Sequence, residues 1–364
     1  MTQALSTIIN ITYEGKDITR NIAPYLLGFT FTDNSGGKAD DLSITLQDEA
    51  GTWLRDWLPS KGDIISASII KTQDTATLSL PCGTFSVDQI DYSFPPSVFA
   101  IKGVSSSIKK QVSQVKKSRT WENVTLSEVI GDIAAENGFS LMMDSSADGH
   151  LEYVDQIEQS DLEFLQTLCA DYGQTVKVQE GRIIVYDLAE YEAKTPALEV
   201  SREDERLISA RFSSKSAQVY KKAHVRYHDP VNDETYDAEY EDDAEEGSER
   251  ELEICERVES QSDAERLAEQ RLNAANRKEI TGSIVLIGDV RLAAGETLQV
   301  SGFGMFSGRH FITKCTHKVD TSGYTTTLEL GQPQSEKAKG KTRKTNRKAQ
   351  SVHPELFYEG EHYY

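Results

Sequence analysis

Two pairs of residues in this sequence have the types and spacing that can support metal binding or acid–base catalysis. His224 and His228 are four residues apart, which would place both imidazoles on one face of a helix. Their context, Ala-His-Val-Arg-Tyr-His, is typical of a strand, in which such side chains lie about 13 Å apart. The adjacent Asp40 and Asp41 would point to opposite faces of a strand. The sequence therefore predicts neither a histidine metal pair nor a catalytic carboxylate pair.

Familiar catalytic and metal-binding motifs do not occur in this sequence. It contains no H-E-x-x-H, no G-x-S-x-G and no Walker loop. Cys82, Cys169, Cys255 and Cys315 are widely separated and include no C-x-x-C pair, which argues against a structural zinc site and a disulfide scaffold. We therefore expect a protein that is not an enzyme and that uses no cofactor and no metal.

The charge balance narrows the class of protein further. The chain has 364 residues and a formal net charge of -20, so it is long enough for two or three domains and too acidic to bind duplex DNA through its overall charge. No stretch approaches the roughly 18 apolar residues of a membrane span, and the first residues show no secretory signal. We expect a globular protein without a membrane span.

The elements that position these residues are mostly strands. Short runs of alternating apolar and polar residues, separated by turns rich in Gly and Asn, fill the first third of the chain and predict a β-sandwich or barrel over residues 1–117. These runs cover residues 8–13, 27–32, 42–46, 64–70, 84–90 and 98–104.

A small α+β domain is predicted over residues 118–195. Thr125 to Glu128 and Ser160 to Glu163 are capping boxes, each followed by apolar residues at helical spacing. A hairpin follows around the turn at Glu180-Gly181. The rest of the chain, residues 196–332, reads as a second β domain that contains one helix, with a third capping box at Ser262 to Glu265.

The two β regions share an order of features. Gly62-Asp63 precedes a strand and then a second strand that begins at Gly83; Gly295-Glu296 precedes a strand and then a second strand that begins at Gly308. This repetition predicts two copies of one β module flanking the insert. The predicted fold class is mainly β with an α+β insert: two β-barrel or sandwich domains flank a small α+β domain.

An ordered set of short motifs gives the sequence a family resemblance. These motifs lie at Gly15–Thr19, Thr32–Ile44, Gly62-Asp63, Gly83–Asp88, Arg119–Trp121, Gln159–Leu165, Arg226–Asp229, Ser262–Arg266 and Gly323–Leu330. Together the motifs resemble the late control protein D family of contractile-tailed phages, over about residues 5–331. Residues 333–364, a basic and then aromatic extension, do not map onto the family pattern.

The resemblance implies a structural role in a virion tail baseplate that is assembled in the host cytoplasm. The family is similar to baseplate hubs and to the N-terminal part of type VI secretion spike proteins. This similarity implies two tail-tube-like domains per chain and a homotrimer that adapts the sixfold tube to the threefold spike around a central channel. The implied partners are the spike, tail tube, baseplate wedge and tape measure proteins, with DNA passing through unbound. The alternative is a tail-associated protein that hydrolyses or binds the cell wall, for which the insert would be the binding module.

Two short segments are candidate interfaces. The polar loop with Asn34, Gly36, Gly37, Asp40 and Asp41 is either an interface loop or a solvated hairpin connection. Trp53 and Trp57 would share one face of a helical turn, which favours core or interface packing over ligand stacking.

Two charged segments leave alternatives open. Asp233 to Glu253 carries twelve acidic residues and one arginine, which fits either a solvated loop or an acidic contact or channel wall. The C-terminal extension is either a solvated arm, a nucleic-acid-binding arm, or a tail that docks on an acidic surface such as that loop of a neighbouring subunit. The residues proposed to dock are Lys341, Arg343, Lys344, Arg347, Phe357 and Tyr358.

Overall fold

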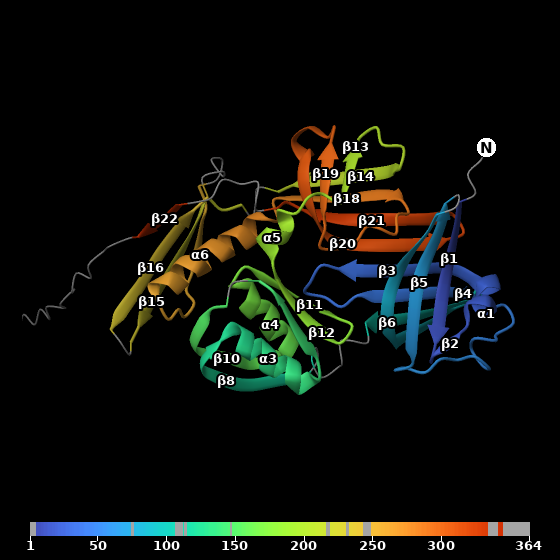
Figure 1. The fold of residues 1–364 in the computed structure, drawn as a ribbon, viewed down its shortest axis with the longest axis horizontal. Helices are drawn as coiled ribbons and strands as arrows, with labels where there is room; N and C mark the ends of the chain where they lie inside the picture. Colours follow the sequence, from blue (N-terminus) through green and yellow to red (C-terminus); the bar gives the residue numbers. More distant parts are fainter. Residues whose placement is uncertain are drawn as a thin grey trace, which may run out of the picture.

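The computed structural model describes residues 5–73, 76–105, 112, 115–145, 148–215, 219–230, 233–242, 249–333 and 341–344. Four hydrophobic cores divide these residues into four units along an elongated molecule (Figure 1). The fold class is mainly β with an α+β insert, as the sequence predicted. Among the described residues, none of the helices has the length and apolar character of a membrane span.

The first β module pairs its strands in the order β3-β4-β7-β6-β5-β1-β2. Alternation along β3 and β4 turns Phe29, Phe31 and Ile44 into the core, where all three are buried. Its elements are β1 (Leu5–Tyr13), β2 (Lys16–Asp17), α1 (Thr19–Ile22), η1 (Ala23–Tyr25), β3 (Leu26–Asn34), β4 (Asp41–Gln47), β5 (Ile64–Gln73), β6 (Ala76–Ser93) and β7 (Val98–Ser105).

The insert packs α3 and α4 against two small sheets. The two predicted capping boxes are confirmed: Thr125 caps α3 with Glu128, and Ser160 caps α4 with Glu163. The predicted hairpin is confirmed as the β11–β12 pair. The elements of the insert are β8 (Lys116–Thr125), α3 (Leu126–Asn137), β9 (Ser140–Asp144), β10 (His150–Ser160), α4 (Asp161–Ala170), β11 (Gln174–Gln179), β12 (Arg182–Asp187) and α5 (Leu188–Glu192).

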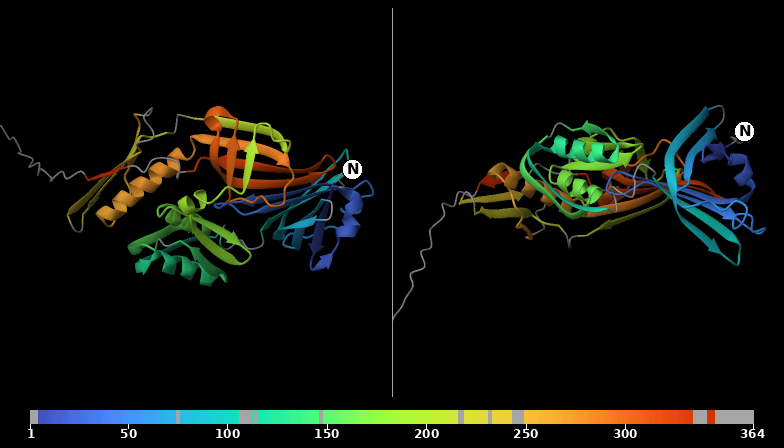
Figure 2. Two further views of the ribbon diagram at one scale, coloured as in Figure 1. Left: turned by 45° about the horizontal axis from the view of Figure 1, so that its top comes forward. Right: turned by 90° about the horizontal axis from the view of Figure 1, so that it is seen from below.

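The second β module has its own core and the strand order β14-β18-β21-β20-β19-β13. It lies between the first module and the fourth unit, which contains α6 (Figures 1 and 2). Its elements are β13 (Leu198–Ser201), β14 (Leu207–Ser214), β18 (Ile280–Ile287), β19 (Thr297–Ser301), η3 (Gly304–Phe306), β20 (Gly308–Asp320) and β21 (Gly323–Gly331).

The fourth unit, which we call the α6 unit, interrupts the second module between β14 and β18. Helix α6 packs on a four-stranded sheet, and Leu267 and Leu272 meet Val225 and Ala238 in a separate core. The residues expected to form one domain at 196–332 are therefore divided between two cores. The elements of this unit are β15 (Lys222–Asp229), β16 (Glu234–Glu241), β17 (Glu251–Ile254), α6 (Gln261–Asn276) and β22 (Lys341–Lys344).

The start of α6 corrects one prediction. The helix was expected to begin with a capping box at Ser262, but Ser260 is its N-cap and accepts a hydrogen bond from the backbone N–H of Asp263. Ser260 and Asp263 also have the cap spacing, so local sequence offered two registers, and the structure uses the earlier one.

The two β modules repeat the same fold. The path β3-β4-β7-β6-β5-β1 corresponds strand by strand to β14-β18-β21-β20-β19-β13. At the predicted Gly-acid turns, the N–H of Gly62 donates to the carbonyl of Val87 (2.8 Å), and the N–H of Gly295 donates to the carbonyl of Ile312 (2.9 Å). Both glycines have positive φ, +99° and +91°, which favours glycine. One difference is that β1 runs antiparallel to β5, whereas β13 runs parallel to β19.

Candidate assembly surfaces

The two modules are joined edge to edge into one sheet. Strand β3 of the first module pairs antiparallel with the second half of β20, from Lys314 opposite Asn34 to Asp320 opposite Gly28. Across this seam the ring of Phe31 stacks on His317, with centroids 6.0 Å apart and planes 13° apart. The backbone ladder and the buried ring pair make the modules one continuous 13-stranded sheet.

The insert docks at the same seam through Asp33. The Asp33 carboxylate accepts hydrogen bonds from Lys177 Nζ of the insert (2.5 Å) and from the N–H of Ala294 of the second module (2.8 Å). Asp40 lies 3.9 Å from the same lysine and accepts from the N–H of Asn34. Burial raises the pKa of Asp40 to about 6. Three units therefore meet at two carboxylates and one ammonium group.

The structure places the predicted interface loop against its own chain. Asn34 and Asp40 are buried, and a Cβ added to Gly36 would come within 3.0 Å of the Val176 carbonyl oxygen. The N–H of Gly37 donates to that same carbonyl, at 3.4 Å. Of the five predicted interface residues in this loop, Gly37 and Asp41 are exposed and remain accessible to another protein.

Two of the strand edges that stay open within the described residues correspond to the strands of the seam. Strand β14 pairs only with β18, and residues 88–93 of β6 pair only with β7. These are the counterparts of β3 and of the second half of β20, which pair with each other inside the chain. Open edges present unpaired N–H and C=O groups that can accept another strand.

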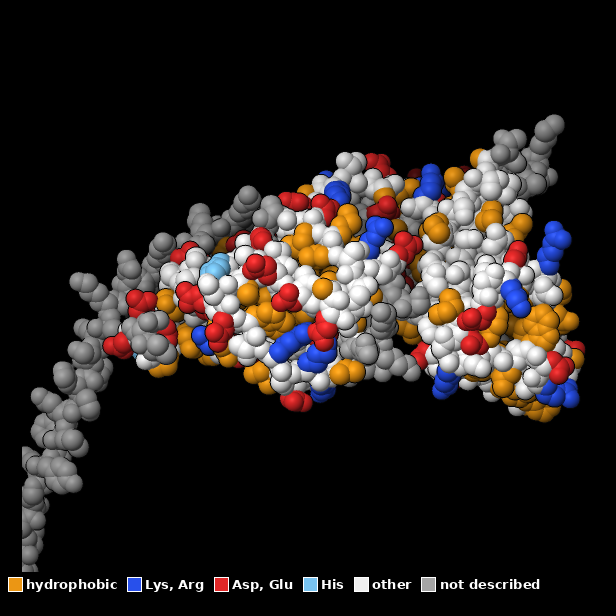
Figure 3. Space-filling view, turned by 60° about the horizontal axis from the view of Figure 1, so that its bottom comes forward, with side chains coloured by type: hydrophobic (Ala, Val, Ile, Leu, Met, Phe, Trp, Pro, Cys, Tyr) orange, Lys and Arg blue, Asp and Glu red, His pale blue; other side chains and the backbone are white. Residues whose placement is uncertain are grey.

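The two predicted tryptophans lie in a surface cluster on the first module. Their segment forms turns rather than a helix, yet the rings touch at 5.5 Å between centroids. Trp53 is buried and contacts Tyr25, whereas Trp57 is 44% exposed beside exposed Leu58. Figure 3 shows hydrophobic side chains gathered at this end of the molecule. The cluster is consistent with protein contact rather than with an isolated ligand-stacking residue.

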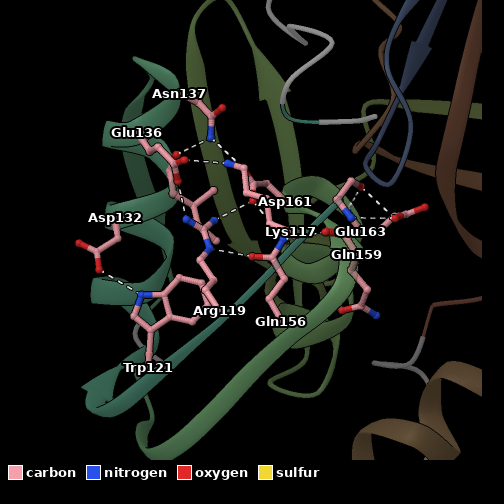
Figure 4. Close-up of polar contacts among 12 residues, drawn as sticks. Lys117, Arg119, Trp121, Asp132, Glu136, Asn137, Gln156, Gln159, Asp161 and Glu163 are labelled. Carbon is pink, nitrogen blue, oxygen red and sulfur yellow. Dashed lines mark hydrogen bonds and ion pairs between the residues drawn. The ribbon is translucent and has the colours of Figure 1, made fainter. Parts of the chain in front are cut away.

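A charged network inside the insert is structural. Asp161 is fully buried and accepts from Lys117 Nζ and Arg119 Nη2, both at 2.7 Å, from Asn137 Nδ2 at 3.0 Å and from Gln156 Nε2 at 3.1 Å (Figure 4). Burial alone would raise the pKa of Asp161, but these hydrogen bonds hold it below its usual range. A carboxylate with four donors is a poor proton acceptor, so the network ties β8, α3, β10 and α4 together.

The acidic segment is mostly strand where it is described. Glu234–Glu241 forms β16 and Glu251–Ile254 forms β17, and residues 243–248 lie outside the described residues. The solvated-loop alternative is therefore wrong for these two stretches, and the alternative of an acidic contact or channel wall stays a prediction. Alternation explains the difference, because Ala238 and Tyr240 turn into the α6 core while acidic neighbours face outward.

The predicted strand context of the histidines is confirmed, since His224 and His228 both lie on β15. The structure adds a group that sequence spacing did not reveal: ligand atoms of His224, Glu251 and Glu253 lie within 4.8 Å of one another. These residues come from two parallel strands, and His224 Nε2 already contacts Asp237 at 3.1 Å.

The C-terminal extension adds a strand to the α6 unit. Residues Lys341, Arg343 and Lys344 lie in β22, which pairs antiparallel with acidic β16 of the same chain, Arg343 opposite Glu239. The remaining candidate docking residues, Arg347, Phe357 and Tyr358, lie outside the described residues.

Comparison with known sequences identifies relatives of this chain. The family described as "Phage tail baseplate hub (GPD)" matches residues 110–323, which is more than half of the chain. Probable baseplate hub proteins of Escherichia phages 186 and P2 are 29% and 30% identical, over 50% and 47% of this chain. The matches cover 45% and 43% of those proteins, so the chain spans less than half the length of each relative it matches.

Solved structures extend the likeness to the first module. A prophage MuSo2 tail protein from Shewanella oneidensis has a TM-score of 0.71 at 13% identity, covering 91% of this chain and 99% of the other. A Neisseria meningitidis tail protein gives 0.67 at 10% identity, covering 90% and 97%. A component of the type VI secretion system of E. coli gives 0.52 at 11% identity, covering 93% and 79%. The shared fold and the sequence match agree, and the chain belongs to the phage tail baseplate hub (GPD) family.

Proposed function

We propose that three copies of this chain form the central ring of a contractile-tail baseplate, in which six β modules adapt a sixfold tube to a threefold spike. The observation that carries this proposal is the repeated module. A closed ring of three chains presents six similar domains, which is what a contact between threefold and sixfold neighbours requires. The matched open edges supply the strands with which such a ring can close.

The proposed role is mechanical and has no covalent step. The relatives carry names of structural tail proteins, and Asp161, the most deeply buried carboxylate of the insert network, is occupied by structural donors. A chain with a net charge of -20 would also let DNA pass through a central channel without binding it. The proposed site of action is the tail baseplate of a virion or a tail-like injection particle.

The proposed partners are neighbours of the same ring. A spike would seat on one face and the tail tube on the other, with wedge proteins and the tape measure as further neighbours. A structure of a Francisella PdpA-VgrG complex shares this fold at a TM-score of 0.53 and 10% identity, which supports likeness of fold alone. The exposed cluster around Trp57 and the accessible residues Gly37 and Asp41 are the proposed contact surfaces.

Mass measurement tests the ring. We expect the purified chain, alone or mixed with its spike protein, to include a species of three times 40.6 kDa per ring. A strict monomer in both samples would contradict the proposal. A peptidoglycan zymogram run beside it separates the alternative role, because a cleared band would indicate a cell-wall hydrolase.

A further inference from the structure

We propose that neighbouring copies of this chain join by pairing β14 of one copy, antiparallel, with residues 88–93 of β6 of the next copy, in the same register in which β3 pairs with β20 inside the chain. This inference rests on the proposed function, which supplies a ring of identical copies. It adds the strands, the residues and the register of the contact.

Backbone irregularities fix which residues correspond in the two modules. The β3–β4 pairing skips Leu27, and the β14–β18 pairing skips Ile208. The β6–β7 pairing skips Asp88, and the β20–β21 pairing skips Thr313. Since bulges occur at fixed places in a repeated sheet, these four positions align the two modules without reference to side chains.

The alignment gives the register of the contact between copies. Phe31 corresponds to Phe212, and His317 corresponds to Tyr92. Inside the chain Phe31 lies opposite His317, so Phe212 lies opposite Tyr92 of the next copy. The neighbouring rungs place Ser213 opposite Asp91 and Arg211 opposite Ser93, by translation of the seam pairs Thr32 with Thr316 and Thr30 with Lys318.

Burial shows which of these corresponding residues lack a covering strand. Phe31 is 4% exposed and His317 is 1% exposed, because each lies in the paired seam. Tyr92, the counterpart of His317 in the first module, is 42% exposed. Phe212, the counterpart of Phe31 in the second module, is half-buried. A second strand across each edge would cover both rings as the seam covers Phe31 and His317.

The ring contacts on the intact side of each edge also match. Phe31 meets Phe85 with centroids 6.0 Å apart, and Phe212 meets His310, the counterpart of Phe85, at 5.8 Å. The ring planes meet at 73° in the first pair and at 38° in the second, so Phe212 has the place of Phe31 beside the equivalent ring but a different tilt. Phe303 and Phe306 also contact Phe212, at 5.3 and 5.4 Å. Tyr92 would supply the aromatic face that His317 supplies inside the chain.

Charge on the outward face of the proposed pair is complementary. Arg211 lies diagonally across from Asp91 in this register, and both side chains are at the surface in the single chain. Asp91 already contacts Lys102 at 2.9 Å, so Arg211 would join an existing ion pair. The two open edges lie on different modules, which makes the contact head-to-tail, and such a contact closes into a ring when its rotation permits.

Engineered cysteine pairs test the register, in a Cys255→Ser background because Cys255 is the exposed native thiol. Asp91→Cys with Ser213→Cys should give covalent dimers and trimers on non-reducing gels after oxidation. Tyr92→Cys with Ser213→Cys places the thiols on opposite faces of the sheet and should give none. Thr32→Cys with Thr316→Cys occupies the equivalent rung inside the chain and calibrates the reaction without changing the mass.

A charge exchange gives a second readout that does not depend on thiol geometry. Arg211→Glu should raise the concentration needed for half-assembly several-fold, and adding Asp91→Lys should restore it toward the value of the unaltered chain. Restoration by the double variant is not expected if the two residues lie apart.

The outcomes separate this inference from the proposed function. Trimers by mass, together with crosslinking of the 92/213 pair instead of the 91/213 pair, or with no restoration by the charge exchange, would overturn the register and leave the ring standing. A chain that remains monomeric in every sample overturns the ring and this contact together. Selective crosslinking of the 91/213 pair and restoration by the double variant support both.

Discussion

The first and second β modules have the same strand order, but the edge strands β3 and β14, which correspond to each other, differ in whether another strand covers them. In the first module β3 is covered by β20, and in the second module its counterpart β14 pairs with only one described strand. Proteins usually protect such edges with charge, bulges or covering elements. A repeated module with one covered and one open edge is what a chain built for head-to-tail assembly requires, because the covered seam displays the contact that the open edges can repeat.

The modules also differ in the segment that leaves their outer strand. In the first module six residues, 35–40, connect β3 to β4, and they dock on the insert. At the equivalent place, the second module carries β15, β16, β17 and α6 of the α6 unit between β14 and β18. The repeated core therefore tolerates a large insertion at this turn, because the turn lies outside the strands that form the seam.

The largest expected difference between the two edges comes from truncating the corresponding phenylalanines, Phe31 and Phe212. Phe31→Ala should lower the free energy of unfolding by about 3–4 kcal/mol, because it leaves a cavity in a sealed core. Phe212→Ala should cost about half as much in the isolated chain, since its ring is only half-buried. Denaturant unfolding at concentrations where the chain is monomeric measures both, and equal losses would contradict the difference between the edges.

Acid should weaken the covered seam through His317. Burial lowers the pKa of His317 to about 4, so the unfolded chain binds a proton at higher pH than the folded chain. The contribution of neutral His317 to the free energy of unfolding is therefore fully present above about pH 6.5. It is lost as the pH falls toward 4, by up to about 3 kcal/mol. His317→Gln should flatten this slope in unfolding measured from pH 7 to 4.5, whereas the same change at exposed His228 should leave it intact.

Asp40, at the junction with the insert, should change stability with pH in the direction opposite to that of His317. Its pKa is raised to about 6, so the stability that it contributes is present below about pH 4 and is lost as the pH rises through 6. Asp40→Asn should therefore gain stability relative to the unaltered chain above pH 6, by up to about 3 kcal/mol. Subtracting the two pH profiles isolates this effect from that of His317. A difference in stability between Asp40→Asn and the unaltered chain that did not change with pH would contradict this prediction. Asp56→Asn, at an exposed carboxyl group, is the matched control.

The Gly-acid turns give the smallest effect and test the repetition itself. Gly62→Ala and Gly295→Ala each place a Cβ in open space at positive φ, so the cost is backbone strain of about 1–2 kcal/mol. The two losses should agree within error in thermal unfolding. A large loss of stability in one variant and none in the other would show that the two turns are not structurally equivalent.

Much of the fold could be predicted because it has local causes. Alternation of apolar and polar residues predicted the strands of the first module. The boxes at Thr125 and Ser160 predicted the starts of α3 and α4, and the turns at Gly62 and Gly295 predicted a repeated module. The box at Ser262 was wrong because Ser260 offers the same spacing two residues earlier, and local chemistry does not choose between them.

The candidate site could be predicted only in part. The loop from Asn34 to Asp41 was expected to be either an interface loop or a solvated hairpin connection. Its partners inside the chain, Lys177 and Ala294, are far away in the sequence. The separate core of the α6 unit was missed because its strands alternate like those of the surrounding module. The available signal was the helix of the α6 unit, since it is the one long helical pattern within the expected β domain.

The sequence alone determined most strands of the β modules, the helices α3, α4 and α6, the turn glycines and the repeated order of features, since each of these depends on residues close together in the chain. Only the tertiary structure decided which strand edges meet, which edges stay open, and that β22 joins β16. A strand edge pairs through backbone N–H and C=O groups that every residue except proline carries. The choice of partner therefore leaves little trace in the side chains, and it becomes visible only when distant strands are placed side by side.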